Sequence, residues 1–150
     1  MNKLVILFVA FFTGLTTLKA QQSEIYTTSD GAIKGFDAVA YFTQNKAVKG
    51  NKQFAVSYKG ATWYFSSVEN KEAFKKDPSK FEPQYGGYCA YGCSRGYKAK
   101  TEGEAFTIVD GKLYLNYNLD VRERWNKDQQ GYIKKADANW GTVKDTKFEE

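Results

Sequence analysis

Two cysteines, Cys89 and Cys93, carry the most reactive side chains of this chain. They lie four residues apart in the stretch YGGYCAYGCSRGY. The chain has no histidine, and its one methionine is Met1. Histidine is both the commonest metal ligand and the commonest general base of proteins, so the sequence lacks both. Apart from Met1, the soft metal ligands are limited to these two thiols.

Three hypotheses account for the cysteine pair, and the sequence leaves all three open. Residues at positions i and i+4 of a helix share one face, so both sulfurs could bind one Cu(I) ion, which favours thiolates. A disulfide is the second hypothesis, as a structural link or as a reducible switch. The third is that both thiols are buried and unpaired, because free cysteine is among the most buried residue types.

Tyrosines cluster around the same stretch, at Tyr85, Tyr88 and Tyr91, with Tyr97 just beyond. A wall of aromatic rings could bind a flat ligand or a sugar. Tyrosine more often buries its ring and leaves its hydroxyl in contact with water, and this structural interpretation is favoured. The first three tyrosines are kept as a candidate binding cluster.

Catalysis is not indicated. Without histidine there is neither a Ser–His–Asp triad nor a Cys–His pair, and no phosphate-cradling loop is present. The net charge is +5, and the basic residues are interleaved with acids, which is typical of a solvated surface. We therefore predict that the protein is not an enzyme and does not bind nucleic acid.

The first 20 residues, MNKLVILFVAFFTGLTTLKA, have the pattern of a signal peptide. Lys3 precedes the apolar run 4–15, and the small residue Ala20 ends the segment. The run is shorter than the roughly 20 apolar residues that a membrane span needs. We expect cleavage after Ala20, export to the periplasm or outside the cell, and no stable membrane insertion afterwards.

Two hairpins are predicted to position the chemical groups. In QFAVSYKGATWYFSS, a turn at Lys59-Gly60 aligns the apolar residues of both arms on one face. In AFTIVDGKLYLNY, Asp110-Gly111 suits a type I′ turn. The predicted pairs are Val56 with Trp63, Phe54 with Phe65, Ile108 with Leu113, Phe106 with Leu115 and Thr107 with Tyr114.

Helices are predicted after each hairpin. Ser66 followed by Glu69 fits a helix N-cap box and predicts a helix over about 67–76. Residues 118–140 have helical spacing, with Asn118 as a cap and Gly131 as a break. This order predicts a small single α+β domain of two antiparallel β-hairpins packed with short helices. The predicted segments are a signal peptide at 1–20, a loosely held N-terminal arm at 21–34, the domain at 35–140 and a frayed C-terminal tail at 141–150.

Four stretches of the domain, GFDAVAYF, GATWYFSSVENKEAFKKDPSKFEPQYGGYCAYG, DGKLYLNYN and GYIKKADANW, resemble the exported YHS-domain-containing proteins of bacteria. The resemblance covers nearly all of 35–140 and therefore implies a YHS-like domain there. That family is similar to the heavy-metal-associated YHS and TRASH domains, which occur in proteins that handle copper and other metals.

The metal-binding relatives carry Asp-Pro-Val-Cys-Gly-Met, then Tyr-Phe-Cys-Ser, then Cys or His three residues after that serine. Asp37 and Val39 fit the first motif, but Ala40 replaces its cysteine. Ser66 replaces the second cysteine, and Asn70 stands in place of the last ligand. The resemblance therefore implies the fold and puts the usual metal site of the family in doubt.

The leading hypothesis is an exported, non-catalytic YHS-type binding module that holds copper or another soft metal through Cys89 and Cys93. The alternative is a thiol-redox or disulfide-stabilised accessory or interaction protein without metal. A metal ion is the one partner that the sequence suggests.

Overall fold

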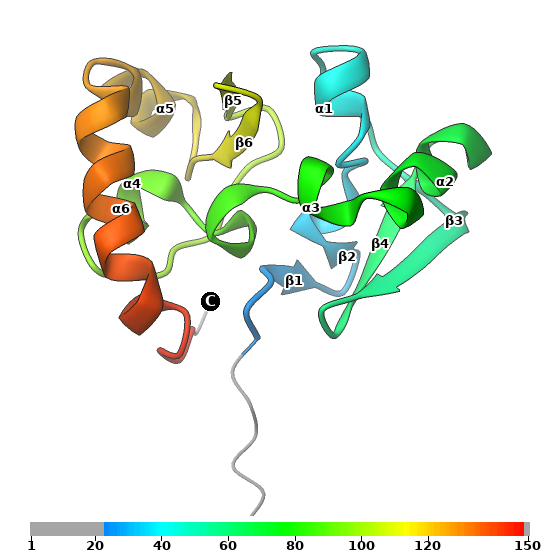
Figure 1. Ribbon diagram of the computed structural model, residues 1–150, viewed down its shortest axis with the longest axis horizontal. Helices are drawn as coiled ribbons and strands as arrows, with labels where there is room; N and C mark the ends of the chain where they lie inside the picture. The colour runs from blue at the N-terminus through cyan, green and yellow to red at the C-terminus, as the bar shows by residue number, and fades with distance from the viewer. Residues whose placement is uncertain (1–22, 149–150) are drawn as a thin grey trace, which may run out of the picture.

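The computed structural model describes residues 23–148, so the predicted signal peptide lies outside the described residues. Within this range short helices alternate with three antiparallel two-stranded sheets, which confirms the α+β class (Figure 1). The strands are β1 (Thr27–Thr28), β2 (Gly31–Ala32), β3 (Asn51–Tyr58), β4 (Ala61–Phe65), β5 (Phe106–Val109) and β6 (Lys112–Leu115). The helices are α1 (Ala40–Thr43), α2 (Val68–Lys76), α3 (Pro78–Phe81), α4 (Ala90–Ser94), α5 (Leu119–Asn126) and α6 (Gln129–Val143), with 3-10 turns η1 (Ile33–Gly35) and η2 (Gln84–Gly87).

Both predicted hairpins are present, and both turns have two residues with positive φ, as a type I′ turn requires. All three predicted pairs of β5 and β6 are found. In β3 and β4, Val56 faces Trp63 as predicted, but the predicted pair of Phe54 with Phe65 is wrong. A β-bulge between Asn51 and Ala55 shifts the register, so that Phe65 lies opposite Asn51.

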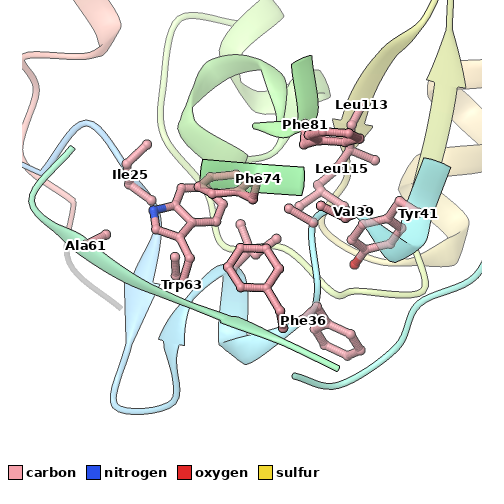
Figure 2. Packing of buried hydrophobic residues seen from close by; sticks show 14 residues of the cluster. Ile25, Phe36, Val39, Tyr41, Ala61, Trp63, Phe74, Phe81, Leu113 and Leu115 are labelled. Atoms are coloured by element: carbon pink, nitrogen blue, oxygen red, sulfur yellow. The ribbon is translucent and has the colours of Figure 1, made fainter. Parts of the chain in front are cut away.

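The molecule has two hydrophobic cores, and β6 lies between them. Leu113 and Leu115 face the first core, while Tyr114 faces the second, because successive strand residues point to opposite sides. The first core lies under β3, β4 and α2, where the Phe74 ring packs 5.2 Å from Trp63 (Figure 2). In the second, Trp125 of α5 packs 5.2 Å from Tyr114.

Residues 23–34 are held more firmly than the sequence predicts. Ile25 is buried in the first core and Tyr26 in the second. The Lys98 ammonium lies beside this segment and donates hydrogen bonds to the carbonyl oxygens of Ser23 (3.2 Å), Lys144 (2.7 Å) and Thr146 (2.8 Å). One buried cation thereby ties the arm to the segment that follows α6.

Two local predictions about the helices need correction. The N-cap of α2 is Ser67, whose hydroxyl oxygen accepts from the Asn70 amide N–H at 3.1 Å, and not Ser66. Gly131 does not break the C-terminal helical region, because the break lies before it. Asp128 caps α6 by accepting from the Gly131 N–H at 3.1 Å, and a Cβ on Gly131 would collide with that carboxylate.

Among the described residues, 23–148, none of the helices has both the length and the apolar character that a membrane span needs.

Candidate functional site

Asp37 is a fully buried carboxylate at the centre of a dense hydrogen-bond network. Its Oδ1 accepts from the backbone N–H groups of Val39 (2.9 Å) and Ala40 (3.1 Å), which forms a turn that leads into α1. Its Oδ2 accepts from the Ser66 N–H (2.8 Å), the Ser66 hydroxyl (2.7 Å) and the Asn70 side-chain amide (2.8 Å). Five hydrogen bonds therefore converge on one side chain.

The donors to Asp37 include the three positions at which metal-binding relatives carry ligands, Ala40, Ser66 and Asn70. The fold brings these positions together from the start of α1, the end of β4 and the first turn of α2. The Asn70 amide also lies 3.4 Å from the Ser66 hydroxyl oxygen. The carboxylate of Asp37 thus accepts hydrogen bonds from residues at all three of these positions.

These residues do not fit a soft metal ion. The three positions supply a methyl group, a hydroxyl and an amide, whereas copper and zinc favour thiolate and imidazole ligands. A carboxylate offers about four lone-pair sites, and the five donors already occupy those of Asp37. Within residues 23–148, no group of three or more His, Cys, Asp and Glu side chains is arranged to hold a metal ion.

Cys89 and Cys93 are both buried and neither forms a disulfide. Cys89 is the N-cap of α4, and Cys93 lies four residues further on, inside that helix. The Cys89 Sγ accepts from the Gly92 N–H at 3.4 Å and lies 3.6 Å from Asn116 Oδ1, to which the thiol donates. Cys93 is packed into the second core. This geometry corresponds to the hypothesis of buried, unpaired thiols.

We expect both thiols to resist alkylation at pH 8 in the folded protein. The thiolate is the reactive form. Burial raises the pKa of Cys89, and it raises the pKa of Cys93 to about 12. Labelling by iodoacetamide, followed by mass spectrometry, should be about a hundredfold or more slower than in the urea-unfolded chain. Rapid labelling of either cysteine in the folded protein would contradict this arrangement.

The three tyrosines of the candidate cluster make different contacts. Tyr88 donates to the Ser23 carbonyl oxygen at 3.2 Å, and the half-buried Tyr91 packs against Tyr132 at 5.2 Å. Tyr85 is 5 % exposed and donates to Asp137 Oδ1 at 2.8 Å. Burial, together with this hydrogen bond, raises the pKa of Tyr85, so its hydroxyl keeps its proton. Of the three, Tyr85 lines the pocket described next.

A pocket of about 370 Å³ lies between the segment before β1, the β3–β4 turn, η2 and α6. This volume is in the range of small-molecule sites. The functional side chains that line it are Glu24, Lys59, Glu82, Tyr85, Asp137 and Trp140. The pocket therefore combines carboxylates, one ammonium group and two aromatic rings.

The backbone of η2 beside this pocket is strained. Tyr85 has φ 56° and ψ 34°, which is a genuine outlier for a bulky residue. Gly86 follows with φ 63°, and a Cβ there would lie 1.7 Å from the Glu24 carbonyl oxygen. Such strain persists only where the surrounding structure fixes it, and it is common at ligand sites.

The sequence does not predict several residues of the Asp37 network and of the pocket as site residues. In the sequence, Asp37 and Asn70 only occupy positions of the metal-binding motifs, and nothing local indicates that they are bonded to each other. Asp137 and Trp140 lie three residues apart on α6, a spacing that places them on one helix face. This spacing is the one local signal for the α6 side of the pocket. It does not indicate Tyr85, which contacts both residues from a distant segment of the chain.

Comparison with known proteins finds a similarity to one family over part of the chain. Residues 39–85 match the family model of the YHS domain. This range contains the Ala40, Ser66 and Asn70 positions around Asp37 and ends at Tyr85. No curated protein and no solved structure matches the chain.

Proposed function

Because residues 39–85 match the YHS domain, we propose that this YHS-domain-containing chain is a non-catalytic binding module with an internal carboxylate at the place where metal-binding relatives hold an ion. The observation that carries this proposal is the convergence of Ala40, Ser66 and Asn70 on Asp37. The module then serves as an accessory or interaction protein. Asp37 contributes to its stability and not to metal transfer.

The proposal is tested by titrating Cu(I) and Zn(II) into the folded protein against a competing chelator. We expect no stoichiometric binding at the Asp37 centre. The matched positive control is the triple variant Ala40→Cys, Ser66→Cys and Asn70→Cys, which places three thiols at the converging positions and should acquire affinity for either ion. Stoichiometric metal binding by the wild type that is lost in Asp37→Asn would overturn the proposal.

A soft metal ion, copper first, held by Cys89 and Cys93 is the second candidate. Its support is the sequence, in which Cys89 and Cys93 are the only two cysteines, lie four residues apart and have no histidine to compete with them for a soft ion. If this candidate is right, copper retention is lost in Cys89→Ser and in Cys93→Ser alike. Retention by both single variants would exclude it and leave the first proposal as the better one.

We also propose that the protein is exported, on the strength of residues 1–20 alone. The N-terminal sequence of protein recovered from the periplasm or the medium should begin at Gln21. Recovery of the intact chain from the cytoplasm would contradict this proposal.

A further inference from the structure

We propose that the pocket between η2 and α6 binds a small organic ammonium ion. This site is separate from both Asp37 and the cysteine pair, and the inference goes beyond the proposed function. Carboxylates alone do not define a ligand site, because surface acids are usually solvated. Here they line a cavity of about 370 Å³ that also has aromatic walls.

The charge of the pocket is opposite to that of the chain. The whole sequence carries a net charge of +5, but the pocket is lined by three carboxylates and one ammonium group. The Lys59 ammonium is already engaged, at 3.1 Å from Glu82 and 3.6 Å from Glu24. One bound cation therefore faces two carboxylates, and the pocket keeps an excess of negative charge that favours a positive ligand.

Asp137 is the carboxylate most available to such a ligand. It lies exposed on α6, and its Oδ1 accepts a hydrogen bond from the Tyr85 hydroxyl at 2.8 Å. No ion pair of Asp137 is present in the described part of the chain. Because Tyr85 is buried and holds Oδ1 in place, the carboxylate is oriented before any ligand arrives.

The aromatic rings supply the second interaction that an ammonium ion needs. The rings of Tyr85 and Trp140 lie 5.9 Å apart, with 63° between their planes. Trp140 is half-buried, so part of its indole remains accessible from the pocket. A cation over an aromatic face is attracted by the ring quadrupole, most strongly for tryptophan. A neutral molecule of the same shape lacks this attraction as well as the attraction to Asp137.

The test uses tetramethylammonium as the probe and tert-butanol as a neutral molecule of similar size. Binding is followed through the indole N–H signal of Trp140 in two-dimensional NMR spectra, at constant ionic strength. We expect a saturable shift with tetramethylammonium and none with tert-butanol. Trp63 and Trp125 are fully buried, so their indole signals serve as internal references.

Two variants test whether binding of tetramethylammonium requires the negative charge of Asp137. Asp137→Asn should weaken tetramethylammonium binding about three- to fivefold, the range of a partly exposed ion pair. Asp110→Asn removes an exposed carboxylate from the β5–β6 turn and should leave the dissociation constant unchanged. Equal binding of tert-butanol, an unchanged dissociation constant in Asp137→Asn, or no shift of Trp140 with tetramethylammonium would each overturn the proposal.

Discussion

Replacement of Asp37 by alanine is expected to lower the free energy of unfolding by about 3–5 kcal/mol, the range for breaking a buried charged network. The variant leaves five hydrogen-bond donors without their acceptor in a region where the carboxylate is fully buried. Each unsatisfied buried donor costs about 1–3 kcal/mol, although local rearrangement recovers part of this. Urea unfolding followed by circular dichroism measures the change.

Two further variants show whether the loss of stability comes from the hydrogen-bond network of Asp37 or from the loss of any carboxylate. Asp37→Asn keeps the shape but replaces one acceptor oxygen by an NH₂ group, which faces donors, so we expect an intermediate loss. The control Asp120→Ala removes an exposed carboxylate from the first turn of α5 and should lower the stability by no more than about 1 kcal/mol, the range for a charge at a helix terminus. A loss below about 1 kcal/mol in Asp37→Ala would show that the network contributes little to the stability.

Replacement of Gly86 by alanine is expected to cost about 3 kcal/mol or more, because two separate penalties apply. The residue has φ 63°, and its new Cβ would lie 1.7 Å from the Glu24 carbonyl oxygen. Relieving this clash moves either η2 or the segment before β1. The same movement weakens the 2.8 Å hydrogen bond from the Tyr26 N–H to the Gly86 carbonyl oxygen.

Gly60 provides the matched control for this clash. It has φ 72°, and no atom lies within 4 Å of a Cβ built on it. Gly60→Ala therefore suffers the left-handed backbone penalty alone, which is about 1–2 kcal/mol. Thermal unfolding of both variants should show the larger loss for Gly86→Ala. Equal losses would mean that the contact between Gly86 and Glu24 adjusts without cost.

The local elements of this fold could be predicted well from the sequence. Asp110-Gly111 between alternating apolar residues fixed the turn and the register of the β5–β6 hairpin, because turn type and side-chain alternation act over short distances. Asn118 as the cap of α5 is confirmed for the same reason. The bulge that moves Phe65 opposite Asn51 has no such local signal, since it depends on how β3 packs against its neighbours.

The candidate sites could be predicted only in part, because they depend on contacts between distant segments. The motif comparison placed Ala40, Ser66 and Asn70 at former ligand positions but could not show that Asp37 accepts hydrogen bonds from all three. Likewise, the spacing of Cys89 and Cys93 suggested a shared helix face. Cys89 instead caps the start of α4, with its sulfur hydrogen-bonded to Gly92 and Asn116, and nothing in the local sequence specified where the helix would begin.

Native mass spectrometry of the protein, purified without reductant or chelator from a host that can export it, tests the central claim most directly. If the protein has an internal carboxylate at Asp37 and two buried free thiols, its mass should be that of the fully reduced, metal-free chain. A mass about 2 Da lower would mean that the thiols are joined in a disulfide. A bound copper or zinc ion that is absent from the Asp37→Asn variant would contradict the claim that Asp37 takes the place of the metal.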